Sequence, residues 1–142
     1  MGTRTAKDRK VCTMSEELKR VMIIDDDELV AEFAAMTLQA VGLSVHYCAS
    51  GERALEEITE FQPQLVLLDT MMPDMDGVET FKALRQLPAG AEVPIVFMTG
   101  KKTGPYQHTY AELGALGVIG KPFEAALLRK QLGTLWQQRS AA

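Results

Sequence analysis

The stretches Leu65-Val66-Leu67-Leu68-Asp69 and Val21-Met22-Ile23-Ile24-Asp25 each join an unbroken apolar run to an aspartate. A short apolar run that is rich in branched aliphatic residues predicts a strand whose two faces are both buried. Such strands are typical of parallel sheets that carry helices on both sides. These stretches therefore predict an α/β fold, and they place acidic side chains where two of its strands end.

Outward from these two stretches, apolar runs alternate with amphipathic segments along the chain. The expected strands are 21–24, 43–48, 65–68, 93–98 and 116–119, and the expected helices are 27–41, 52–61, 78–87, 105–113 and 123–138. Gly42 is expected to stop the first helix, Ser50 to cap the second, and Pro105 suits the first position of the fourth. The alternation predicts one (βα)5 unit with right-handed crossovers and helices on both faces of the sheet.

Length and composition limit the class of protein. The chain has 142 residues, of which 46% are hydrophobic and 24% charged, so it can bury one core and is not disordered throughout. No apolar run approaches the roughly twenty residues of a membrane span. A net charge of −4 argues against nucleic-acid binding by the domain as a whole.

The sequence also predicts the cellular location. The first residues lack a secretory signal, and Cys12 and Cys48 are interpreted as unrelated thiols in a reducing compartment, which predicts a cytoplasmic protein.

The boundaries of the folded part follow from the same pattern. We expect an N-terminal tail at 1–19, one folded domain at 20–138 and a short C-terminal tail at 139–142. Residues 1–13 are polar, which suits either a non-native remnant or a disordered native arm.

Ionisable and hydroxyl residues follow four of the five expected strands. Asp25 and Asp26 follow the first strand, Asp69 the third and Thr99 the fourth, and Lys121 comes after the fifth. Parallel strands end at one edge of their sheet, about 4.8 Å apart, so these side chains can gather there. Clustered carboxylates require a proton or a cation, and all-oxygen ligands favour Mg²⁺. A lysine and a hydroxyl beside such a cluster are candidate phosphate ligands.

Several other polar or sulfur-containing residues favour structural roles. The loop Asp74-Met75-Asp76-Gly77 lacks the ligand spacing of a calcium-binding EF-hand, so Asp76 is interpreted as a helix cap and Gly77 as a turn residue. Surface or packing roles are expected for His46 and His108, and packing roles for Met71, Met72, Met75 and Met98.

Four motifs together resemble the receiver domain of two-component response regulators. They are Val21-Met22-Ile23-Ile24-Asp25-Asp26-Asp27, Leu65 to Gly77, Phe97-Met98-Thr99-Gly100 and Gly120-Lys121-Pro122-Phe123. The resemblance covers about residues 20–138. It implies a flavodoxin-like five-stranded parallel sheet of order 2-1-3-4-5 with helices on both faces.

The resemblance also implies roles for individual residues. Asp69 would accept a phosphoryl group, Asp26 would bind Mg²⁺ directly, and Asp25 would bind it largely through water. The backbone carbonyl of Met71 would be a further metal ligand, and Thr99 and Lys121 would contact the phosphoryl oxygens. The resemblance also implies a cis peptide bond before Pro122. The implied donor is a phosphohistidine on a sensor histidine kinase or a histidine phosphotransfer protein, and the implied output is a downstream protein or a severed output domain.

Two positions depart from the family pattern. Gly100 stands where alanine or serine is usual, and Val118 stands where many receivers carry a switching aromatic residue. Valine has a stiff χ1 and little volume, so the switch is expected to use backbone shifts in the loop 100–104. The switched surface is the one formed by the helix 105–113, the strand 116–119 and the helix 123–138. Residues 114–119 also lack the acidic pair and tyrosine of the winged-helix transcriptional class, which weighs against that class's receiver dimer.

Two other functions remain as alternatives. A small aspartyl-phosphate hydrolase of the haloacid-dehalogenase type would need a second aspartate where Met71 stands. A pseudo-receiver scaffold without phosphorylation would be expected to lack part of the acidic triad, which is complete here. The favoured interpretation is a phospho-acceptor signalling domain that is not an enzyme acting on a separate substrate.

Overall fold

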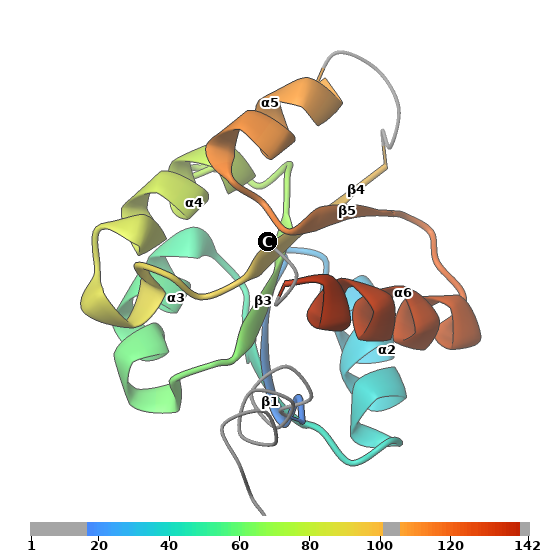
Figure 1. The fold of residues 1–142 in the computed structure, drawn as a ribbon. Helices are drawn as coiled ribbons and strands as arrows, with labels where there is room; N and C mark the ends of the chain where they lie inside the picture. Colours follow the sequence, from blue (N-terminus) through green and yellow to red (C-terminus); the bar gives the residue numbers. More distant parts are fainter. Residues whose placement is uncertain (1–16, 101–105, 140–142) are drawn as a thin grey trace, which may run out of the picture.

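The computed structural model describes residues 17–100 and 106–139, which form one five-stranded parallel sheet flanked by helices (Figure 1). The strands are β1 (Arg20–Ile24), β2 (Ser44–Cys48), β3 (Leu65–Asp69), β4 (Ile95–Thr99) and β5 (Gly117–Gly120). Their order across the sheet is β2-β1-β3-β4-β5, which confirms the predicted topology. The central strands β3 and β4 are buried along their whole length, as their apolar sequences predict.

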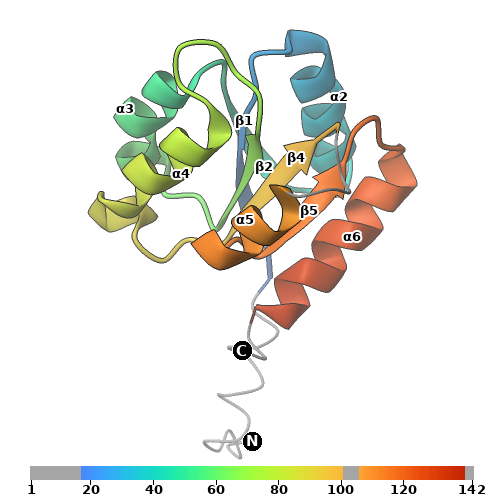
Figure 2. The same cartoon turned by 90° about the horizontal axis from the view of Figure 1, so that it is seen from above.

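The helices form two layers, one on each face of the sheet. They are α2 (Glu28–Gln39), α3 (Gly51–Phe61), α4 (Gly77–Arg85), α5 (Tyr106–Leu113) and α6 (Ala125–Gln138), with a 3-10 turn, η1 (Pro88–Gly90), after α4. Figures 1 and 2 show α2 and α6 on one side of the sheet and α3, α4 and α5 on the other. Each layer covers its own apolar core, because successive strand residues point to opposite faces. Among the described residues, no helix is both long and apolar enough to cross a membrane.

Local sequence signals set the starts of α2, α3 and α4 and the end of α2. Asp27 and Ser50 accept hydrogen bonds from the first-turn N–H groups of α2 and α3, and Asp76 forms a reciprocal capping box with Glu79 in α4. Gly42 follows α2 with φ of 94°, a conformation that glycine adopts without strain. The predicted capping roles of Ser50 and Asp76 are therefore confirmed.

Element boundaries differ from prediction by a few residues, for identifiable reasons. β4 begins at Ile95, since Pro94 has no N–H to donate to the sheet. α6 begins at Ala125 because Glu124 is still extended and serves as its N-cap residue. The prediction for Pro105, the loop 101–105 and the tails at 1–16 and 140–142 fall outside the described residues.

Two expectations at the end of β3 were wrong. Met71 is not a packing residue, since its side chain is 78% exposed, whereas Met72 and Met98 are buried. Gly77 is needed for a close approach rather than for a turn. A Cβ at this position would lie 2.4 Å from the backbone oxygen of Asp69 and 2.7 Å from the Cα of Thr70. The start of α4 therefore packs directly against the backbone at the end of β3.

Candidate functional site

Strand register brings the predicted site residues to one edge of the sheet. Ile24 on β1 pairs with Leu68 on β3. Asp25 directly follows Ile24 and Asp69 directly follows Leu68, so the two aspartates lie side by side at the ends of adjacent strands. On the other side of β3, Asp69 pairs with Met98, the residue before Thr99. Thr99 in turn pairs with Gly120, the residue before Lys121. Residues from four strands thus converge where the strands end.

Lys121 links the two buried aspartates. Its Nζ donates hydrogen bonds of 3.0 Å to Asp25 Oδ2 and 3.0 Å to Asp69 Oδ1. Asp25 is fully buried and the Asp69 side chain is 6% exposed, while the Lys121 side chain keeps 18% of its surface in contact with solvent. Charge-assisted hydrogen bonds of this kind hold all three side chains in place. The peptide bond between Lys121 and Pro122 is cis.

Burial and like charges shift the ionisation of this cluster. Burial, followed by the charge of Asp25, raises the pKa of Asp69 to about 6, although Lys121 acts in the opposite direction. Burial alone would lower the pKa of Lys121, but its hydrogen bonds to Asp25 and Asp69 outweigh that effect and raise the pKa. One lysine therefore leaves part of the carboxylate repulsion uncompensated, and a further cation would be stabilised here.

The donor set fits a magnesium ion. Carboxylate oxygens of Asp25, Asp26 and Asp69 lie within 4.8 Å of one another, two of these residues being buried and Asp26 exposed. Mg²⁺ is bound in proteins by one or two carboxylates together with several waters, which the exposed side of this cluster can admit. The cluster contains no sulfur or imidazole that would favour a softer metal.

Asp25 is held by contacts that the sequence did not reveal. Its Oδ1 accepts from the N–H of Asp27 at 2.9 Å, and its own N–H donates to the Cys48 carbonyl at 3.1 Å. The Tyr47 hydroxyl donates to the Asp25 carbonyl oxygen at 2.8 Å. Tyr47 belongs to no sequence motif. Only its position near the end of β2, which pairs with β1, could have indicated this role.

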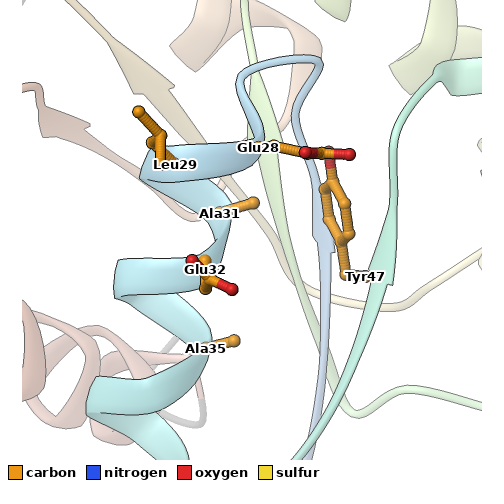
Figure 3. A pocket seen from close by; sticks show the side chains of 6 residues that line it. All are labelled: Glu28, Leu29, Ala31, Glu32, Ala35 and Tyr47. Carbon is orange, nitrogen blue, oxygen red and sulfur yellow. The ribbon is translucent and has the colours of Figure 1, made fainter.

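Tyr47 also borders a cavity of about 410 Å³ between α2 and β2, where it faces Glu28 (Figure 3). Burial, followed by the negative charge of Glu28 and then of Asp25, raises the pKa of Tyr47. The phenol therefore stays protonated and remains a donor to the backbone of Asp25.

The family model for the response regulator receiver domain matches residues 21–133. The chain belongs to the response regulator receiver family. Among curated relatives, it is 36% identical to the DNA-binding response regulator MtrA of Mycobacterium tuberculosis over 106 residues, which are 75% of this chain and 45% of that protein. It is 35% identical to the transcriptional regulatory protein DltR of Streptococcus agalactiae over 121 residues, 85% of this chain and 53% of that protein. The receiver spans about half the length of these curated relatives.

Solved structures show the same fold. The receiver matches the chemotaxis protein CheY4 of Vibrio cholerae with a TM-score of 0.78 and 29% identity, over 84% of this chain and 99% of that chain. A response regulator from Chloroflexus aurantiacus matches with a TM-score of 0.77 and 31% identity, over 84% of this chain and 98% of that chain.

The receiver carries an aromatic residue near Thr99, but on a helix. Val118 on β5 is partly buried against the core, whereas Tyr110 on α5 is buried and stacks on Phe97 with ring centroids 4.5 Å apart. Tyr110 and the buried Thr99 line one cavity of about 420 Å³ together with Gly100. No sequence signal indicated Tyr110, because the hydrophobic period of a short helix does not show which of its residues lies against the end of β4.

Proposed function

We propose that this receiver accepts a phosphoryl group on Asp69 from a phosphohistidine donor in a Mg²⁺-dependent reaction, and that the phosphorylated form changes its binding partner. One observation carries the proposal. The Asp69 carboxylate ends a central strand, bonded to Lys121 and clustered with Asp25 and Asp26. Membership of the receiver family supports the same function.

The reaction would proceed by in-line transfer. A carboxylate oxygen of Asp69 forms a bond to phosphorus as the bond from phosphorus to the donor imidazole nitrogen breaks, and the imidazole leaves with the electron pair. Bound Mg²⁺ would neutralise charge on the transferring phosphoryl group. Lys121 can hold one phosphoryl oxygen, and Thr99 can donate its hydroxyl to another. Asp25 and Asp26, with the carbonyl of Met71, would hold the ion.

This receiver would act as a signalling domain rather than as an enzyme with its own substrate. Met71 occupies the position at which an aspartyl-phosphate hydrolase of the haloacid-dehalogenase type needs a second acid. The acidic triad is complete, which favours a phosphorylated receiver over a pseudo-receiver scaffold. The domain itself would contact proteins and not nucleic acid. Its output would pass to a downstream protein or to an output domain, through the surface formed by α5, β5 and α6.

Magnesium is expected to stabilise the fold and to be required for phosphorylation. Ion binding relieves repulsion that exists only in the native cluster, and a ligand at 100 times its Kd adds about 2.7 kcal/mol. Thermal unfolding with and without Mg²⁺ should therefore show a higher midpoint with the ion. Treatment with acetyl phosphate, read by intact mass, should give a phosphorylated protein only when Mg²⁺ is present.

The variant that tests this ion site is Asp26→Ala, which removes an exposed ligand without opening the core. It should be more stable than the wild type without metal, show no magnesium-dependent rise in the unfolding midpoint, and take up no phosphate. Asp27→Asn is the matched control, because asparagine caps a helix as well as aspartate does. An equal magnesium-dependent rise in Asp26→Ala would contradict the assignment.

An apolar patch beside the site suits a phosphohistidine-bearing helix of the donor. Leu29 and Phe33 on α2 border a hollow of about 220 Å³ together with Lys121, Pro122 and Phe123. Leu29 is 77% exposed and Phe33 45% exposed, and Phe33 stacks on Phe123 at 5.9 Å. Exposed apolar groups gathered beside a reactive carboxylate are typical of a protein-binding surface. A donor seated here would bring its histidine over Asp69.

Leu29→Glu is expected to slow phosphotransfer from a protein donor at least about tenfold, since burying an unpaired charge at an interface costs several times RT. Transfer should be timed with the phosphohistidine protein that donates fastest to the wild type, and acetyl phosphate should phosphorylate the variant at the wild-type rate. Met36→Glu, which is also exposed (63%) but lies two turns further along α2, is the control and should behave as the wild type. If phosphorylation of Leu29→Glu by acetyl phosphate were also slower, the defect would lie in the phosphorylation site and not in docking of the donor protein.

A further inference from the structure

Three ligating side chains of different chemistry meet between β2 and α3, away from the acidic cluster. His46 and Cys48 are two residues apart on β2, so both point to the face that α3 covers, and Glu57 extends from α3 towards them. Glu57 Oε1 lies 2.5 Å from His46 Nε2 and 3.5 Å from Cys48 Sγ. One ligand atom from each residue lies within 4.8 Å of the other two.

Neighbouring residues orient two of these ligands. Arg53 holds the other carboxylate oxygen of Glu57, Oε2, through its Nε at 2.9 Å and its terminal nitrogen at 2.7 Å. Oε1 is thereby directed towards His46 and Cys48. The His46 ring stacks on Phe61 with centroids 5.2 Å apart. Partners that fix ligand orientation in this way are a regular feature of metal sites in proteins.

The cluster is open to solvent on one side. A hollow of about 560 Å³ borders His46, Arg53, Glu57 and Phe61. The His46 side chain is 38% exposed and that of Glu57 25%, whereas Cys48 is buried. An ion could therefore enter from the hollow, meet a buried sulfur ligand at its far end, and keep water in a remaining coordination position.

We propose that His46 Nε2, Cys48 Sγ and Glu57 Oε1 bind one divalent transition-metal ion of the zinc type, with a fourth position open to the hollow. Thiolate and imidazole ligands favour zinc over magnesium and calcium, so this site is distinct in metal preference from the acidic cluster. The thiolate and the carboxylate balance the two charges of the ion. Binding releases the thiol proton of Cys48, and any proton shared by His46 and Glu57, to solvent.

The present distances require only a small adjustment. Tetrahedral coordination at zinc bond lengths separates ligand atoms by roughly 3.5 Å. The contact between Cys48 and Glu57 already has this length, while His46 and Glu57 must move apart by about 1 Å on the same estimate. Both of these side chains are partly exposed, so they can move without disturbing the core.

Cobalt(II) provides the direct test, because a cobalt–thiolate bond gives a charge-transfer band in the near ultraviolet. The titration uses the full chain in a Cys12→Ser background, so that Cys48 is the only thiol, with saturating Mg²⁺ to occupy the acidic cluster. We expect a charge-transfer band and visible d–d bands that saturate at one equivalent and disappear when zinc is added. Absence of the charge-transfer band in the folded protein would overturn the proposal and leave these residues as a hydrogen-bonded cluster only.

Variants identify the ligands. Cys48→Ser should abolish the charge-transfer band, and circular dichroism should verify that it folds. His46→Ala changes a partly exposed side chain outside the core, and it should weaken zinc binding by more than about 100-fold, the upper end of the cost of losing an outer-shell partner. Glu60→Gln, exposed on the same helix and bordering the same hollow, is the matched control and should bind as the parent does. A charge-transfer band that persists in Cys48→Ser, or equal affinity in His46→Ala, would overturn the assignment.

Discussion

Asp69→Asn is expected to abolish phosphorylation. The amide has nearly the same size as the carboxylate and can still accept a hydrogen bond from Lys121, but it is not a nucleophile towards phosphorus. Wild type and variant should be treated with acetyl phosphate and Mg²⁺ and compared by intact mass. We expect a phosphorylated species for the wild type and none for the variant, which is the largest effect of any substitution proposed for this chain.

Other aspartates lie close to Asp69, so the assignment of the phospho-acceptor is tested against one of them. Asp27→Asn, which keeps the cap of α2, should accept phosphate at the wild-type rate. Thermal unfolding of both variants verifies that they are folded. Phosphate uptake by Asp69→Asn equal to that of the wild type would show that another side chain is the acceptor, and the proposed function would need a different nucleophile.

Gly77→Ala is expected to destabilise the fold by about 3 kcal/mol, the upper end of the range for overpacked positions. The added methyl would lie 2.4 Å from the Asp69 carbonyl oxygen and 2.7 Å from Thr70 Cα. Both are backbone atoms, so no side-chain rotation can relieve the contact, and α4 must move away from β3. The displacement would shift the backbone that carries Asp69, so phosphorylation should slow as well. Urea unfolding should show a lower midpoint with an unchanged slope.

Gly133→Ala is the matched control for that substitution. Gly133 lies on the exposed side of α6, and a Cβ there meets no atom within 4 Å. Alanine should therefore stabilise the helix by about 1 kcal/mol through its better helix propensity. A loss of stability in Gly133→Ala, or none in Gly77→Ala, would contradict the steric explanation.

The apolar strand sequences carried most of the information about the fold. Leu65–Leu68 and Val21–Ile24 have no polar position, so both of their faces must be covered, and the helices between the strands can supply that cover only in a doubly wound parallel sheet. The strand order β2-β1-β3-β4-β5, which the family resemblance implied, is confirmed. It also brings Asp25, Asp69 and Lys121 to one edge, where the structure places them in contact.

Element ends were predicted where a side chain acts on its own backbone. Ser50 and Asp76 cap helices through contacts within three residues, and a local pattern can reveal such contacts. Gly77 shows the limit of this reasoning. Its sequence context indicates a turn, yet what excludes a side chain there is the backbone of Asp69 and Thr70 on another element.

The class of fold and the set of residues at the ends of the strands could be deduced from the amino-acid sequence, because hydrophobic periodicity and strand direction are properties of short segments. Three contacts became apparent only in the folded molecule: Lys121 contacts Asp25 across 96 positions of the chain, Tyr47 supports the Asp25 backbone, and Glu57 contacts Cys48. These contacts depend on how separate elements pack against each other. Packing is set by the shape and register of the whole core, which no local pattern specifies.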